Sequence, residues 1–159
     1  IADPASRIPI IPLIISPHSW SVLDANVSIL STRIEKQVSC LGLYNRYQNL
    51  RETSVGEWFS LVTQEGKILG ISSALRVTGD RYQVDGFCHA SYSDSFRDLI
   101  QAAITWCSDH GASEISLRLS DEDEEKMSFI TSAGFHNPKP DGYFQYDNKK
   151  VDALLYTLD

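Results

Sequence analysis

The residue types best suited to proton transfer or nucleophilic attack lie close together between residues 81 and 89. This run, RYQVDGFCH, alternates as a strand does and carries Asp85, Cys88 and His89. Carboxylates and imidazoles are common general acids and bases, and an unperturbed imidazole titrates near neutral pH. Strict alternation would place Asp85, Phe87 and His89 on one face of the strand. A cysteine nucleophile is disfavoured, because the nearest base to Cys88 is His89, which is too close along the strand to face it.

The polar segment that follows, ASYSDS at residues 90–95, leads directly into a well-marked helix. The first N–H groups of a helix have no partner within it, and the helix dipole adds positive potential, so such a start can bind an anion. The hydroxyl side chains would add further donors. Ser95 and Asp98 also have the spacing of a capping box, so a plain capped helix start is the competing interpretation. Ser120 and Asp123 have the same spacing before the next expected helix.

Hydrophobic periodicity predicts the elements that must hold these residues in place. On the N-terminal side we expect helices at about 20–37 and 40–50, and strands at about 58–63 and 68–77 that form an antiparallel meander with 81–88. On the C-terminal side we expect a helix ending at His110-Gly111, a strand at 114–120, a helix ending at Gly134, and a hairpin of 143–146 with 153–158. The first of these C-terminal helices should bury one face, made of Phe96, Leu99, Ile100, Ala103, Ile104 and Cys107.

Composition excludes several classes of protein. The chain has 159 residues, which fits one domain, and its net charge of −7 argues against a nucleic-acid-binding surface. No apolar run approaches the length of about 20 residues that spans a bilayer. An acidic surface would weakly favour a cationic partner. The acidic run 121–125 has a simpler interpretation, because carboxylates are favourable in the first turn of a helix.

Cysteine and proline usage add two expectations. The three cysteines, Cys40, Cys88 and Cys107, are odd in number and lack a C-x-x-C pair, which argues against a disulfide framework and a zinc site. A reducing compartment, the cytoplasm, fits this usage best. Residues 1–17 hold four of the six prolines and are expected to form an extended arm or an edge strand before a single domain at 18–159.

The order of the expected elements resembles the GNAT superfamily of N-acetyltransferases. The segments that carry the resemblance are VDGFCHASY, LIQAAITWCSDHGASEISLRL, SFITSAGF, and the closing GYFQY with ALLYTL. It covers residues 57–158 well and the N-terminal helices loosely. The resemblance implies an α/β (α+β) fold, with a mixed, mostly antiparallel central sheet of six to seven strands flanked by four helices.

The resemblance also implies a cofactor site. In this family the central sheet opens beside the strand that corresponds to residues 81–88, and the pantetheine arm of acyl-CoA lies in that opening. Backbone groups of Phe87 and Cys88 would then polarise the thioester. The pyrophosphate would lie on Ser91, Tyr92, Ser93, Asp94 and Ser95, although the glycines usual in this loop are missing. No metal is implied.

The resemblance further implies direct attack by an amine on the thioester. Asp85, or His89 through a water molecule, would be the base. The family often places a tyrosine acid in the helix before its Gly-Phe, where this chain has Ile130. Tyr143 or Tyr146 on the following strand is a candidate substitute, and packing is the alternative role for either.

The resulting hypothesis is an acyl-CoA-dependent N-acetyltransferase acting on a small-molecule or peptide amine, with no nucleic-acid or membrane partner. The alternative is a binding or regulatory module of the same fold without catalysis, which the missing glycines and the missing tyrosine favour. A third interpretation is an oligomerisation domain that uses the proline-rich arm. The sequence leaves open a homodimer, or a neighbouring domain of a longer chain.

Overall fold

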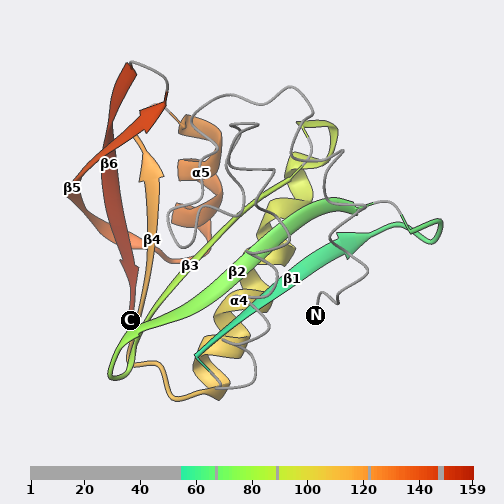
Figure 1. Cartoon of the computed structure of the whole chain (residues 1–159), viewed down its shortest axis with the longest axis horizontal. Helices are drawn as coiled ribbons and strands as arrows, with labels where there is room; N and C mark the ends of the chain where they lie inside the picture. Colours follow the sequence, from blue (N-terminus) through green and yellow to red (C-terminus); the bar gives the residue numbers. More distant parts are fainter. Residues whose placement is uncertain (1–54, 67, 89, 122, 147–148) are drawn as a thin grey trace.

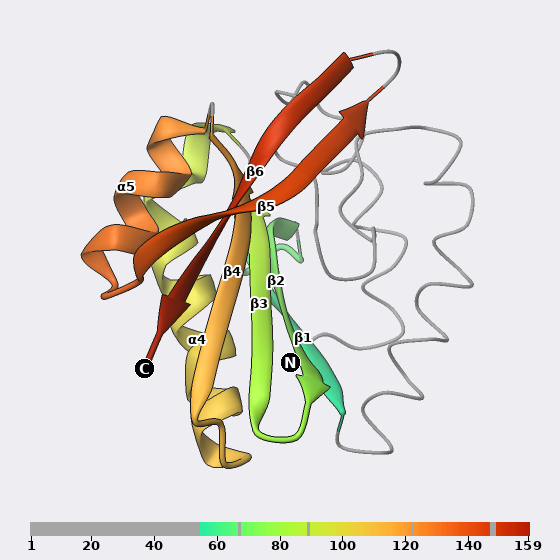
Figure 2. The same cartoon turned by 90° about the vertical axis from the view of Figure 1, so that its left-hand side faces the viewer.

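The computed structural model describes residues 55–66, 68–88, 90–121, 123–146 and 149–159. The proline-rich arm, the two expected N-terminal helices and His89 lie outside the described residues. Within them, one six-stranded sheet has the order β1-β2-β3-β4-β6-β5, and two α-helices pack against one of its faces (Figures 1 and 2). The mixed sheet agrees with the expected fold class.

The elements follow the chain in this order: β1 (Gly56–Val62), β2 (Ile68–Thr78), β3 (Arg81–Cys88), the 3₁₀ helix η2 (Ala90–Ser95), α4 (Phe96–Asp109), β4 (Glu114–Ser120), α5 (Glu124–Ser132), β5 (His136–Tyr146) and β6 (Lys149–Leu158). All neighbouring strands are antiparallel except β3 and β4, which are parallel. A parallel pair needs a crossover, and α4 supplies it. Neither helix is long and apolar enough to cross a membrane, in the part of the chain that the structure describes.

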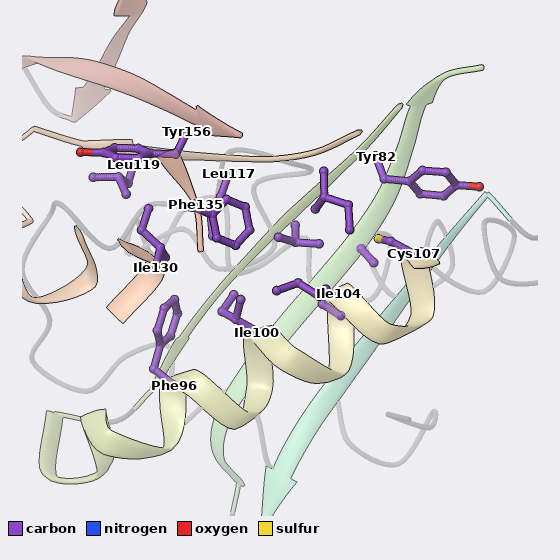
Figure 3. Packing of buried hydrophobic residues seen from close by; sticks show 14 residues of the cluster. Tyr82, Phe96, Ile100, Ile104, Cys107, Leu117, Leu119, Ile130, Phe135 and Tyr156 are labelled. Carbon is purple, nitrogen blue, oxygen red and sulfur yellow. The ribbon is translucent and has the colours of Figure 1, made fainter. Parts of the chain in front are cut away.

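The hydrophobic core lies between α4, α5 and the sheet (Figure 3). The predicted buried face of α4 is confirmed, because all six of its apolar residues at helical spacing are buried. All of them except Leu99 belong to one cluster with apolar side chains of the sheet, such as Val84 and Leu117, and with Ile130 of α5. Ser72 of β2 also donates its hydroxyl hydrogen to the Leu99 carbonyl at 2.7 Å, which links the sheet to α4.

The predicted capping boxes are wrong at both helices. Ser95 precedes α4 with helical φ and ψ and makes no side-chain capping bond, because η2 runs directly into α4. At α5 the N-cap is Asp123, whose Oδ1 accepts the Lys126 N–H at 3.1 Å. The predicted box had Ser120 as the cap, but Ser120 is still part of β4.

The closing hairpin is longer than expected. Its first strand begins at His136, seven residues before the predicted start at Tyr143, because His136, Lys139 and Pro140 also pair with β6. This part of β5 contains Pro138 and Pro140, which lack an N–H and are tolerated because β5 is an edge strand.

Candidate active site at the diverging strands

The two central strands, β3 and β4, separate soon after they begin. Only Arg81, Tyr82 and Gln83 pair with β4, opposite Glu114, Ile115 and Ser116. From Val84 to Cys88 the strand pairs with β2 alone. The remaining backbone groups on that side of β3 therefore take no part in a ladder with β4, and this edge lies in the middle of the sheet (Figure 2).

Asp85 lies on the part of β3 that does not pair with β4, and it is completely buried. Its Oδ1 accepts a hydrogen bond from the Gly86 N–H at 2.7 Å, so the carboxylate folds back onto its own strand. The same oxygen lies 2.5 Å from the Nζ of Lys126. Gly86 must lack a side chain, because a Cβ there would meet the Ile71 carbonyl oxygen of β2 at 2.5 Å.

Lys126 reaches Asp85 from the first turn of α5, the helix that follows β4. The ion pair therefore connects the two sides of the strand divergence. The Lys126 side chain is only 6% exposed, and its Nζ lies 5.6 Å from the centre of the Phe96 ring at the start of α4. Phe96 itself packs into the core near Phe129.

The charge of Lys126 also affects the pKa of two further titratable groups. Burial and, to a smaller extent, the Asp98 carboxylate raise the pKa of the Cys88 thiol to about 12, and the Lys126 ammonium opposes the rise. Burial also raises the pKa of Asp123 above its usual value, against the attraction of Lys126. Cys88 is therefore a protonated thiol at neutral pH, which agrees with the weak sequence case for a cysteine nucleophile.

The predicted pyrophosphate segment forms a 3₁₀ helix with a kink at Tyr92. The i→i−3 bonds of such a helix use part of its own N–H groups, so fewer amides face outward than in an open loop. Tyr92 is 45% exposed. The i→i−3 bonds of the 3₁₀ pattern do not involve the first N–H groups of this segment.

Tyr143 is far from Asp85. It lies on β5, and β4 and β6 separate that strand from β3. Three strand spacings amount to at least about 14 Å. The ring is 48% exposed and lies 4.5 Å from the Nζ of Lys150, while its carbonyl accepts a hydrogen bond from Arg118. The structure thus does not bring Tyr143 together with Asp85.

Sequence reasoning missed Lys126. It ends an acidic run and therefore resembles an ordinary surface charge. The available signal was helical spacing, since Lys126 lies four residues before Ile130 and so shares its face of α5. A hollow lined by Glu124, Met127, Ser128, Thr131 and Ser132 lies on another face of the helix. Over the described ranges, no cluster of three or more metal-ligand side chains is present.

Comparison with known proteins identifies the fold. No family model matches the chain, and no curated protein matches its sequence. Among solved structures, it is similar to the ribosomal-protein-S5-alanine acetyltransferase of Vibrio fischeri, with a TM-score of 0.76 and 16% identity over 99% of this chain and 90% of that one. It is also similar to yncA of Salmonella typhimurium, solved with acetyl-CoA, with a TM-score of 0.68 and 17% identity over 99% and 90% of the two chains.

A third similar structure is a spermidine N-acetyltransferase chimera from Vibrio cholerae and hSSAT, with a TM-score of 0.62 and 14% identity over 79% of this chain and 83% of that one. Identities this low establish the fold alone. The chain has the GNAT-superfamily fold, as its element order and segments suggested.

Proposed function

We propose that the protein is an N-acetyltransferase that uses acetyl-CoA, or another acyl-CoA, and transfers the acyl group to an amine by direct attack in a ternary complex. The single observation that carries the proposal is the early separation of β3 from β4 in a GNAT fold. It leaves a strand edge in the centre of the sheet, where an extended amide-containing chain could hydrogen-bond.

The residues along that edge have distinct roles in the proposal. The pantetheine arm would lie along Val84–Cys88, where the N–H groups of Phe87 and Cys88 would polarise the thioester carbonyl. The pyrophosphate would lie at Ser91–Ser95, on the amides at the start of η2 together with the serine hydroxyls.

Asp85 is the proposed general base, with His89 acting through water as the alternative. Its Oδ1 lies 2.5 Å from the Nζ of Lys126, and a carboxylate can accept a proton from the attacking amine. Because Asp85 is fully buried, the amine must enter the opening to reach it. Tyr143 remains a candidate only for contacts with the distal part of a bound substrate, since it lies on the far edge strand.

The acceptor is a primary amine of a small molecule or a peptide. The net charge of −7 favours a cationic acceptor over an anionic one by long-range attraction. Similar proteins act, by their names, on an alanine of a ribosomal protein and on spermidine. A peptide with an N-terminal alanine and spermidine are therefore the first two probes.

The second candidate function is a binding or regulatory module without turnover. Two observations favour it: the 3₁₀ bonding of the segment at Ala90–Ser95, and Ile130 at the position of the usual tyrosine. The module would have lost strong affinity for acyl-CoA, whereas the enzyme requires both the binding of acyl-CoA at the strand edge and the release of free CoA.

Thermal unfolding with and without acetyl-CoA tests the proposed site. At about 100 times its dissociation constant, a ligand that binds only the folded state adds about 2.7 kcal/mol of stability, so the Tm should rise by several degrees. Free acetate at the same concentration should leave the Tm unchanged. An unchanged Tm at millimolar acetyl-CoA would contradict the enzyme. Release of CoA is measured with each amine probe and with water alone as the acceptor. A raised Tm without CoA release in any of these assays would support the binding module.

A further inference from the structure

We propose that Lys126 is a catalytic residue of the transfer reaction: its ammonium protonates the departing thiolate of CoA, and Asp85 restores that proton. The inference rests on the proposed function and deepens it. It assigns the acid of the reaction to a residue that the sequence alone did not single out. The geometry that supports it is a buried ammonium in direct contact with the candidate base, where the central strands diverge.

The position of Lys126 is costly for a residue that serves stability alone. Lys126 lies in the first turn of α5, where the helix dipole is positive and disfavours a cation. Its side chain is 6% exposed, and a buried ion pair seldom stabilises a fold more than apolar residues of the same size. A buried charged pair held in an unfavourable place is typical of a functional site.

The contact with Asp85 directs the Lys126 Nζ toward β3. Asp85 on β3 contacts it, and Asp123 on its own helix attracts it. The other group close to it is the Cys88 thiol, whose burial keeps it protonated and therefore unable to compete as a nucleophile. One turn further along the same face of α5, Ile130 is buried and has no proton to give.

The proposed step balances in protons and in bonds. A neutral amine attacks the thioester carbon, and the new C–N bond forms as the Asp85 carboxylate takes a proton from the amine nitrogen. The C–S bond then breaks, and the thiolate takes a proton from the Lys126 ammonium. The proton on Asp85 passes to the neutral Lys126 amine across the 2.5 Å contact, which restores the ion pair. The net products are the amide and free CoA.

The test compares variants of Lys126 and Asp85 in the full chain, with CoA release measured chromatographically. The probes are acetyl-CoA with spermidine and acetyl-CoA with an alanine-terminated peptide. Lys126→Gln should lower kcat by about 10²–10⁴-fold and change the KM for acetyl-CoA little. Asp85→Asn should lower kcat in the same way. The matched control is Lys139→Gln, an exposed lysine on β5, which should act as the wild type does.

Lys126→Arg separates proton donation from charge, and its thermal unfolding midpoint checks that the variant is folded. Arginine retains the positive charge and the pairing with Asp85 but does not release its proton in proteins. We therefore expect a loss of kcat close to that of Lys126→Gln. A second readout is p-nitrophenyl acetate, whose leaving group departs without a proton. Lys126→Gln should use this donor as well as the wild type does.

Each other result has a defined meaning. Wild-type kcat in Lys126→Arg would overturn proton donation by Lys126, and equal losses with acetyl-CoA and with p-nitrophenyl acetate would reduce Lys126 to a positioning residue. If the wild type releases CoA and Lys126→Gln does so equally fast, the inference fails and the proposed function stands. If the wild type neither binds acetyl-CoA nor releases CoA, both fail together.

Discussion

Asp123 has two opposing effects on stability at the start of α5. Its carboxylate caps the helix by accepting the Lys126 N–H, a bond worth about 1 kcal/mol in typical helices. The same carboxylate is largely removed from water, which raises its pKa above the usual value despite the nearby ammonium. The folded state therefore binds a proton at Asp123 more readily than the unfolded state does.

Asp123→Asn should be at least as stable as the wild type at neutral pH. A raised folded-state pKa contributes stability below the unfolded pKa of 3.8, and this contribution is lost as pH rises through the folded pKa. Asparagine caps equally well and does not titrate. In urea unfolding between pH 4 and pH 7, the free energy of unfolding of the variant should rise relative to that of the wild type as pH rises. A steady deficit of about 1 kcal/mol, as expected for Asp123→Ala, would contradict this account.

Single residues of the site were predictable from the sequence only where they follow a strand's alternation. Asp85 could be placed on β3 from its neighbours, because alternation is a local property. Its partner Lys126 could not, since the contact joins residues 41 positions apart and depends on how α5 packs after β4. The residue type also suggested a surface position, because lysine is rarely buried unless it is paired.

At the scale of elements, α4 was the best-predicted part of the chain. Its six buried apolar residues recur at helical spacing, so the sequence alone defined which face packs on the sheet. The extent of β5 was missed, because Pro138 and Pro140 argue against a strand unless its edge position is already known. The divergence of β3 from β4 came from the family resemblance, since no local pattern encodes it.

The buried face of α4 makes a direct stability prediction. Ile100 is 1% exposed and packs in the core, so Ile100→Ala should lower the free energy of unfolding by about 2–5 kcal/mol. Gln101, the next residue, is exposed, and Gln101→Ala should change stability by less than about 0.5 kcal/mol. Chemical denaturation of both variants checks the comparison. Equal losses would mean that the face of α4 in contact with the sheet has been assigned wrongly.

At the scale of the whole molecule, two thiols, half-buried Cys88 and fully buried Cys107, should make the protein sensitive to alkali. Burial raises the pKa of both Cys88 and Cys107 from 9.0 to about 12. A raised folded-state pKa means that their stabilising contribution is complete below pH 9 and is lost as pH rises from 9 toward 12.

The double variant Cys88→Ser with Cys107→Ala should therefore lose less stability than the wild type between pH 8 and pH 10.5. The comparison uses the change with pH and not the absolute stability, because truncating buried Cys107 also leaves a small cavity. Denaturant midpoints at both pH values provide the measurement. Equal losses of stability between the two pH values in the wild type and the double variant would show that other groups cause the alkaline sensitivity.

The junction between β3 and β4 has a mechanical consequence for the described part of the chain. Within the sheet, three ladder pairs connect a half made of β1, β2 and β3 to a half made of β4, β5 and β6, while the pairings within each half are longer. Beneath the sheet, both halves share the hydrophobic core with α4 and α5. The ion pair of Asp85 with Lys126 crosses the same seam. A ligand bound there would contact both halves and restrict their motion relative to each other. Amide hydrogens bordering the seam should then exchange with solvent more slowly, while those in the outer hairpins keep their rates.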